Sequence, residues 1–275
     1  MNDGLRSFSV LMSIYYKETP SYLDACFVSI ANQSLLPMEI VCVFDGPLGI
    51  ELESIVAKWE NILNICIVRL PVNVGLGNAL NEGLTHCSFN IVARMDSDDI
   101  CAIERFQKQI PLFFSDNELV LLGSSIDEFE TSENIIKSVR KVPFSDAEIR
   151  QYCKIKNPFN HMTVVFRKDV ILSLGGYQHH LLMEDYNLWL RVIAKGHKVK
   201  NIDDSLVKAR IGNGMVGRRK GLKYIKSEWD LFILKKKLGI QSVLPGFLIL
   251  LLRSVPRLLP KIFLSKLYDI SRAKN

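Results

Sequence analysis

The sequence predicts an α/β protein with a single, mainly parallel mixed sheet that is flanked by helices. Apolar runs of strand length alternate with segments whose apolar residues recur at helical spacing. Polar residues follow three of the strand-like runs, at Asp45, Asn73 and Asp96, and open parallel sheets bind their ligands at the carboxyl ends of the strands. A chain of 275 residues, 48% hydrophobic and 23% charged, is long enough to bury a full core.

The first half of the chain contains four expected strands joined by helices. The strands cover residues 8–15, 39–44, 65–70 and 90–95. The helices between them cover residues 23–31, 50–59 and 76–87. This β-α-β-α-β-α-β order is typical of a parallel sheet whose faces are covered by helices.

After residue 114 the alternation becomes less regular. Short strands are expected at residues 119–122 and 162–166, and helices at 185–195 and 218–238. No internal repeat divides the chain, so we expect one large domain with an appendage at its C-terminal end.

Residues 241–275 form a basic and apolar tail. They contain six basic residues and one acid, Asp269, so the tail carries +5 of the net charge of +6. Its longest apolar run, 247–252, is far shorter than the roughly 20 residues of a membrane-spanning helix. The pattern is typical of a helix that lies on an anionic membrane, and a helix packed on the core or an oligomer contact is the alternative. Because the positive charge is concentrated here, nucleic-acid binding is not indicated.

The six cysteines and the N-terminal segment indicate a cytoplasmic protein. The cysteines are widely separated, which is typical of thiols in a reducing cytosol and favours neither a disulfide framework nor a zinc site. The first apolar run, 8–15, is too short for a signal peptide.

Three carboxylates, Asp96, Asp98 and Asp99, follow the strand at 90–95, and Arg94 precedes them. Two carboxylates at alternate positions in a turn can converge on one divalent cation, and hard oxygen ligands suit Mg²⁺ or Mn²⁺. The alternative is a helix start, with Asp98 or Asp99 as the N-cap.

Five motifs in order carry a resemblance to a known family: FSVLMSIYYKE, VFDGP, NVGLGNALNEGL, ARMDSDD and MEDYNLWLR. Together they resemble the family 2 glycosyltransferases of bacterial exopolysaccharide and O-antigen synthesis, and residues 207–232 are similar to the amylovoran type. The resemblance implies a glycosyltransferase-A fold, with a Rossmann-like sheet in a catalytic domain over residues 1–240. Its nucleotide-binding half would cover about 1–115 and its acceptor half about 116–240, followed by the tail.

The resemblance also implies a nucleotide-sugar site at the carboxyl ends of the strands. Asp45 would accept a hydrogen bond from the uracil ring, Asp96 would lie nearest the ribose, and Asp98 would bind the metal. The other residues implied on the donor side are Tyr15, Glu18, Asn73, Gly75, Gly77, Asn78, Asn81 and Arg94. The alternatives are an Asp-Gly-Pro turn at Asp45, surface loop at 15–18 and a plain helix start after Gly75.

On the acceptor side, a sugar hydroxyl must lose its proton as it attacks the anomeric carbon, and a nearby carboxylate is the usual base. We assign this task to Asp185, with Glu184 orienting the acceptor, and a helix N-terminus is the alternative. His161 is a candidate on the acceptor or metal side. Arg210, with Arg218 and Arg219 among nearby glycines, indicates a basic lid over a diphosphate, or else a solvated loop.

The expected activity is an inverting transfer from a nucleoside-diphosphate sugar, most simply a UDP-sugar, with Mn²⁺ or Mg²⁺ as cofactor. The expected acceptor is a polyprenyl-diphosphate-linked saccharide at the inner face of the bacterial plasma membrane. The chain lacks the Gln-x-x-Arg-Trp motif and the spanning helices of processive members, so we expect one sugar per encounter. A sugar-phosphate nucleotidyltransferase or a non-catalytic scaffold of a polysaccharide-assembly complex are the alternatives. The first would carry a glycine-rich loop where this chain has SIYYKETPSY.

Overall fold

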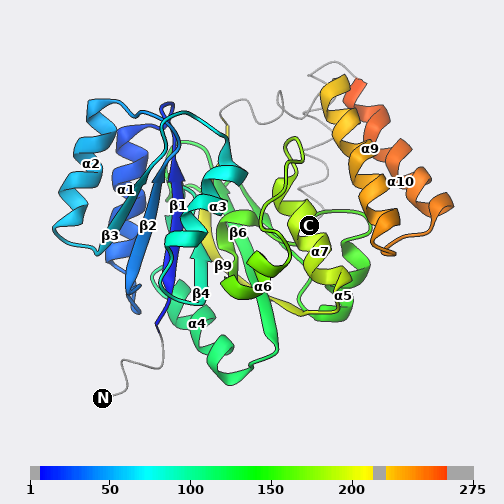
Figure 1. Ribbon diagram of the computed structural model, residues 1–275, viewed down its shortest axis with the longest axis horizontal. Coiled ribbons are helices and arrows are strands. Elements are labelled where there is room, and N and C mark those ends of the chain that lie inside the picture. Colours follow the sequence, from blue (N-terminus) through cyan, green and yellow to red (C-terminus); the bar gives the residue numbers. More distant parts are fainter. Residues whose placement is uncertain (1–6, 213–220, 259–275) are drawn as a thin grey trace.

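The computed structural model describes residues 7–212 and 221–258. Within these ranges one nine-stranded mixed sheet runs through the molecule, in the strand order β3-β2-β1-β4-β8-β6-β9-β5, and β7 pairs with β6 (Figure 1). The strands are β1 (Ser9–Ile14), β2 (Glu39–Phe44), β3 (Ile65–Arg69), β4 (Ile91–Arg94), β5 (Ile100–Cys101), β6 (Leu119–Phe129), β7 (Ser138–Arg140), β8 (Val165–Arg167) and β9 (Lys198–Arg210).

The first four strands pair in parallel, as their helical connections require. The second half of the sheet is different, because β8 is antiparallel to both β4 and β6, while β9 runs parallel to β6. The sheet is therefore mixed, and the carboxyl ends of β1, β2 and β4 lie at one edge, which is where the expected donor residues follow the strands.

Both faces of the sheet are covered, which explains why β1 and β2 are buried at every position. One face packs against α1 (Pro20–Ala31), α2 (Ile50–Glu60) and α4 (Arg105–Ser115). The other face packs against α3 (Leu76–His86) and α7 (Glu184–Ala194). Alternate residues of β1 therefore enter two separate cores, with Met12 in the first and Leu11 in the second.

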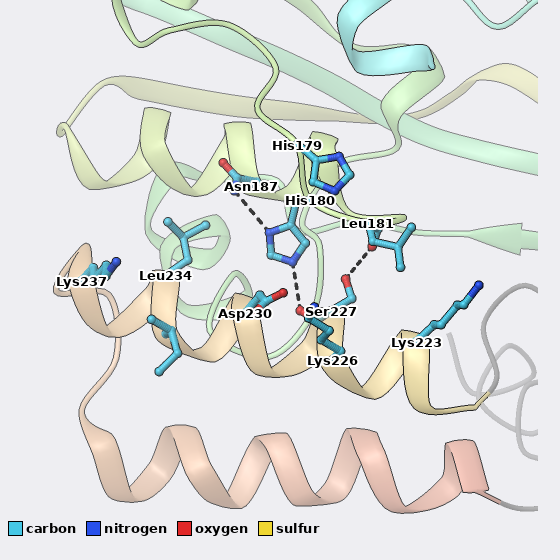
Figure 2. Close-up of a pocket in the computed structure, with 11 residues that line it drawn as sticks. His179, His180, Leu181, Asn187, Lys223, Lys226, Ser227, Asp230, Leu234 and Lys237 are labelled. Atoms are coloured by element: carbon cyan, nitrogen blue, oxygen red, sulfur yellow. Dashed lines mark hydrogen bonds between the residues drawn. The ribbon is translucent and has the colours of Figure 1, made fainter. Parts of the chain in front are cut away.

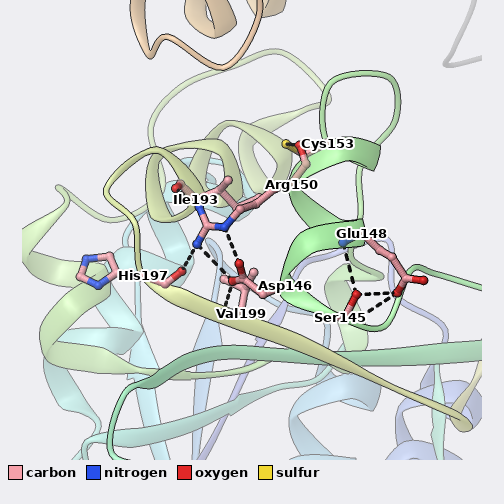
Figure 3. A network of polar contacts seen from close by, with 8 residues as sticks. All are labelled: Ser145, Asp146, Glu148, Arg150, Cys153, Ile193, His197 and Val199. Atoms are coloured by element: carbon pink, nitrogen blue, oxygen red, sulfur yellow. Dashed lines mark hydrogen bonds and ion pairs between the residues drawn. The ribbon is translucent and has the colours of Figure 1, made fainter.

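A network of polar contacts fixes the C-terminal end of α7 (Figure 3). Arg150, on α5 (Asp146–Tyr152), donates to the carbonyl oxygens of Ile193 at 2.7 Å and His197 at 2.8 Å. Its guanidinium also pairs with Asp146, whose carboxylate accepts from the backbone N–H of Val199 at 3.1 Å. The helix that carries Glu184 and Asp185 is thereby tied to the start of β9.

Two sequence-based boundaries are wrong, and three strands, β5, β7 and β9, were not predicted. Residues 161–163 form a short 3₁₀ helix, η2 (His161–Thr163), so the strand expected from 162 begins only at Val165. The strand expected at 119–122 continues to Phe129, because the whole of β9 pairs with it. β9 itself was not predicted, since its exposed positions carry Lys and Asp residues that read as a polar loop.

The chain ends in a helical hairpin of α9 (Leu222–Lys237) and α10 (Val243–Ser254), followed by the short 3₁₀ helix η3 (Val255–Leu258); Figure 1 shows the two long helices side by side. Arg253 of α10 makes a forked ion pair with the buried Glu228 of α9, at 2.8 and 2.7 Å. Gly246 lies so close to Phe232 that a Cβ would stand 2.9 Å from the ring. One side of α10 is thus packed on the protein, as the alternative for the tail required, and Arg253 does not face outward.

The opposite side of α10 is apolar and exposed. Its outward residues recur every three or four positions, and Leu244 and Leu252 are 72% and 74% exposed. The others are Val243, Phe247, Leu248 and Leu251. None of the helices in the described ranges has the length and apolar character that crossing a membrane requires.

Candidate active site

The carboxyl end of β4 places a buried arginine beside the aspartate cluster. Arg94 is 1% exposed and pairs through Nη2 with Oδ1 of Asp96. Its Nε and Nη1 have no hydrogen-bond partner within the described structure, and a buried guanidinium with free donors is costly unless a ligand satisfies it. Arg94 and Asp96 therefore come together as the sequence indicated.

The three aspartates are crowded enough to repel one another. Burial, followed by the charges of Asp96 and Glu18, raises the pKa of Asp98 to about 7. Burial and the charges of Asp98 and Asp96 also raise the pKa of Asp99. The next helix, α4, begins at Arg105 with Glu104 as its N-cap, so neither Asp98 nor Asp99 is the helix cap that was considered as the alternative.

Arg210 lies at this turn and not in a loop. It is the last residue of β9, its backbone N–H donates to Asp99 Oδ1 at 2.7 Å, and its Nε donates to the Asp98 carbonyl at 3.3 Å. The guanidinium stacks on the ring of Tyr22 at 3.6 Å. The assignment of Arg210 to a glycine-rich lid is therefore corrected, since strand pairing and stacking fix it beside the aspartates. Arg218 and Arg219, and most of the expected lid, lie outside the described residues.

The aspartate turn fits a divalent cation that is shared with a phosphate group. In residues 7–212 and 221–258 no three His, Cys, Asp or Glu side chains gather as a metal site made by protein alone. A cation held with diphosphate oxygens needs only one or two carboxylates. Asp98 offers a hard oxygen ligand, and a cation would offset both the burial and the neighbouring negative charges that raise its pKa.

The loop after β1 contacts the same turn through Glu18. The hydroxyl of Ser97 donates to Glu18 Oε2, and the charge of Glu18 contributes to the raised pKa of Asp98. Tyr15 is 40% exposed and meets Tyr16 edge-on. Glu18 is thus joined to the aspartate turn, while Tyr15 is free to face a ligand.

The carboxylate of Asp45 is occupied by the loop that leads into α3. It accepts from the backbone N–H groups of Val74 at 2.7 Å and Gly75 at 3.1 Å, and from Asn73 Nδ2 at 3.0 Å. Gly46, at φ +86°, lies so close that a Cβ would stand 2.7 Å from the Asn73 nitrogen. Asp45 therefore holds this loop in place, and its contact with uracil stays a prediction.

The helix that follows the loop joins the two halves of the site. Asn78 is exposed and donates back to the Val74 carbonyl at 3.0 Å. Asn81 donates to the Tyr177 carbonyl and accepts from the Tyr177 N–H, both at 2.7 Å. A Cβ on Gly77 would lie 3.7 Å from Glu184. The donor loop and the acceptor segment are consequently packed against the same helix.

Glu184 and Asp185 form the first turn of α7, as the helix-start alternative predicted. Their carboxylates nevertheless have separate surroundings. Asp185 Oδ2 accepts from Asn157 Nδ2 at 2.7 Å, whereas burial raises the pKa of Glu184. Leu182, just before them, adopts φ +62°, a left-handed conformation that costs a leucine free energy. Strain next to candidate catalytic residues is typical of functional sites.

His161 and Tyr177 lie between the aspartate turn and α7. The His161 Nε2 and the Tyr177 hydroxyl are 3.1 Å apart. Burial and the charge of Arg94 lower the pKa of His161, while Asp96 and Asp185 act in the opposite direction. The ring therefore lies within electrostatic reach of both carboxylate sets. Sequence reasoning missed Tyr177 and Asn157, although the paired glycines at 175 and 176 marked a special turn before Tyr177.

Comparison with known proteins decides the family. The profile described as "Glycosyl transferase family 2" matches residues 9–172. The chain belongs to glycosyl transferase family 2. It is therefore a glycosyltransferase, as the five motifs indicated.

Full-length relatives support the family 2 assignment. The chain is 48% identical over 265 residues to the amylovoran biosynthesis glycosyltransferase AmsE of Erwinia amylovora, covering 96% of this chain and 99% of that one. It is 39% identical over 228 residues to the Escherichia coli UDP-Gal:alpha-D-GlcNAc-diphosphoundecaprenol beta-1,3-galactosyltransferase, covering 83% and 82%.

Solved structures confirm the glycosyltransferase-A fold. Staphylococcus aureus TarS 1–349 in complex with UDP-GlcNAc matches with a TM-score of 0.66 at 18% identity, covering 89% of this chain and 70% of that one. The mannosyltransferase PcManGT of Pyrobaculum calidifontis, in complex with GDP-Man and Mn²⁺, matches with a TM-score of 0.62 at 17% identity, covering 88% and 67%.

Proposed function

We propose that this family 2 glycosyltransferase moves a sugar from a UDP-sugar to a lipid-linked saccharide in bacterial surface-polysaccharide synthesis, with inversion at the anomeric carbon. One observation carries the proposal. The Arg94–Asp96 pair and the Glu184–Asp185 turn belong to different halves of the chain, and the His161 ring, 3.1 Å from the Tyr177 hydroxyl, feels the charges of both Asp96 and Asp185. A donor and an acceptor bound at these two places would meet above that ring.

The donor side has groups for each part of a nucleotide sugar. Asp98, with Asp96 beside it, would hold Mn²⁺ or Mg²⁺ against the diphosphate. When bound, the cation neutralises the charge of the departing nucleotide. The Nε and Nη1 groups of Arg94, which have no partner in the described structure, would donate hydrogen bonds to an oxygen of the nucleotide sugar. These bonds would offset the free-energy cost of burying the guanidinium. The name of the E. coli relative favours UDP-galactose among possible donors.

The acceptor side offers a base with a fixed orientation. Asn157 holds one oxygen of Asp185, which leaves the other to take the proton of an incoming hydroxyl. Glu184 is partly buried beside Asp185. Its carboxylate would orient the acceptor by accepting a hydrogen bond from it. Direct displacement with a single base gives inversion, so an α-linked donor would yield a β-glycoside.

Two relatives favour the lipid-linked acceptor. AmsE is named for amylovoran biosynthesis, and the E. coli relative acts on a diphosphoundecaprenol-linked sugar by its name. A nucleotidyltransferase would need a glycine-rich loop after β1, where this chain has Tyr15 to Glu18. A scaffold without activity would not need the strained and buried arrangement around Glu184.

The function is tested by incubating the full chain with a panel of radiolabelled nucleotide sugars, Mn²⁺ and bacterial lipid extract. We expect label from a UDP-sugar in the lipid fraction. Labelled sugar 1-phosphates or nucleotide exchange without transfer would instead support the nucleotidyltransferase, and no turnover with any donor would support the scaffold.

We also propose that the outward face of α10 lies on the inner face of the plasma membrane. This face is a continuous apolar stripe, and the sequence beyond it adds Lys261, Lys266, Arg272 and Lys274. Each basic residue near an anionic leaflet contributes about 1 kcal/mol, and each apolar side chain roughly 1.5–3 kcal/mol when fully buried. These two contributions support a peripheral position on the membrane surface.

Replacing three outward leucines, Leu244→Ser, Leu248→Ser and Leu252→Ser, should weaken binding to acidic vesicles more than tenfold, because their combined apolar contribution is several kcal/mol. The fold should be unaffected, since all three are exposed. Vesicle flotation measures the effect. Truncation at Gln241 is less suitable, because it would leave the buried Glu228 without Arg253.

The matched control carries the same change at three exposed isoleucines far from α10: Ile50→Ser, Ile62→Ser and Ile103→Ser. This control should float like the parent protein. Equal flotation of the α10 variant and the parent would show that the stripe does not contact lipid.

A further inference from the structure

A pocket of about 470 Å³ lies between α9 and the loop that precedes Glu184 (Figure 2). The loop is fixed to the helix at the floor of the pocket. His180 Nε2 lies 2.9 Å from the Ser227 carbonyl, and the Ser227 hydroxyl donates to the Leu181 carbonyl. Hydrogen bonds between the loop and α9 therefore fix the two walls of the pocket relative to each other.

One end of the pocket is basic. Lys223 and Lys226 lie one turn apart on the same face of α9, and His179 lies on the opposite wall. In the described ranges neither lysine takes part in an ion pair. Asp230 also lines the pocket, one turn beyond Lys226, and Lys237 lies at the far end. The lining is positive overall, which suits an anion at the Lys223–Lys226 end.

Apolar residues line part of the remaining wall. Leu181 on the loop and Ile233 and Leu234 on α9 line it. A pocket that sets basic groups beside apolar side chains fits an anion attached to a hydrocarbon chain better than a free anion. The exposed stripe of α10 is separate from this pocket, because α9 lies between the pocket and α10 (Figure 2).

The pocket adjoins the acceptor side of the site and not the donor side. Asn187 of α7, the helix that begins with Glu184 and Asp185, lines the pocket together with the segment 179–181 that precedes it. None of the pocket residues belongs to the Asp96–Asp99 turn, where the donor diphosphate is expected. An anion bound in this pocket would therefore be distinct from the donor diphosphate.

We propose that Lys223, Lys226 and His179 bind the diphosphate of a lipid-linked acceptor, and that Leu181, Ile233 and Leu234 contact the first units of its hydrocarbon chain. The assignment rests on the proposed function, because it presumes that the acceptor is lipid-linked. It gives α9 a specific role: the helix selects acceptors by their diphosphate and directs the attached sugar toward Asp185.

Calorimetry with farnesyl diphosphate, a short prenyl diphosphate, tests the assignment on the full chain saturated with UDP and Mn²⁺. The double variant Lys223→Gln, Lys226→Gln should bind farnesyl diphosphate at least tenfold more weakly than the parent. The matched control, Lys195→Gln with Lys236→Gln, removes two exposed lysines outside the pocket and should bind like the parent. Leu181→Ser should weaken farnesyl diphosphate binding and leave inorganic pyrophosphate binding unchanged.

Three results would overturn the assignment. The first is unchanged farnesyl diphosphate affinity in the lysine double variant, and the second is an equal loss in the control. The third is pyrophosphate binding as tight as farnesyl diphosphate, which would make the pocket a site for free anions. In the first case, detachment of the double variant from phosphatidylglycerol vesicles would show that the lysines bind the membrane surface instead. Failure of the parent to bind UDP would contradict the donor site instead.

Discussion

Asp98→Asn is expected to reduce sugar transfer by about a thousandfold or more, because a cation that neutralises a leaving diphosphate is worth several kcal/mol. The Mn²⁺-dependent part of UDP binding should be lost as well. The fold should remain intact, and thermal stability should stay equal or rise, since the change removes one charge from a crowded carboxylate cluster. Calorimetric titration of UDP with and without Mn²⁺ measures the effect.

Asp203→Asn is the matched control, because Asp203 is exposed on β9 and has no place in the site. It should bind UDP and transfer sugar like the parent. Unchanged Mn²⁺-dependent UDP affinity in Asp98→Asn would contradict the assignment of Asp98 as a metal ligand.

Asp185→Asn is expected to lower the transfer rate by about 10²–10⁴, the usual contribution of a general base. The substituted amide keeps an oxygen that can accept from Asn157, so the helix start should be undisturbed. Donor binding should survive, because Asp185 contacts no residue of the aspartate turn among the hydrogen bonds described. Single-turnover transfer, with UDP affinity measured alongside, separates the two effects.

Glu184→Gln is the comparison for this variant. If Glu184 only orients the acceptor, its replacement should raise the acceptor KM more than it lowers kcat. A near-parent rate in Asp185→Asn, together with loss of transfer in Glu184→Gln, would assign the base to Glu184.

The first half of the fold was predictable because its strands are buried on both faces. β1 and β2 are apolar at nearly every position, and their ends follow from the polar residues that come next. β9 was not predictable in the same way. It alternates exposed Lys and Asp with buried positions, and register shifts near Ser124 and Ser125 interrupt the alternation with β6.

The site residues were found from strand ends and motifs, whereas their partners were not. The sequence predicted that Asp45 lies at the sheet edge, but it did not reveal the three hydrogen bonds that Asp45 accepts from the loop at 73–75. The sequence also predicted Arg210 near a diphosphate, but it did not predict that Arg210 ends β9 and bonds to Asp99. Contacts such as that of Asn81 with Tyr177 join segments far apart in the chain, so no local pattern reveals them.

The stereochemistry of the product tests the central claim most directly. In the proposed mechanism one base, Asp185, acts in a single displacement on a donor held at Asp98. NMR of the glycoside formed from an α-linked UDP-sugar should therefore show a β linkage. An α linkage in the product would require two displacements or a different mechanism, and would contradict the roles given to both aspartates.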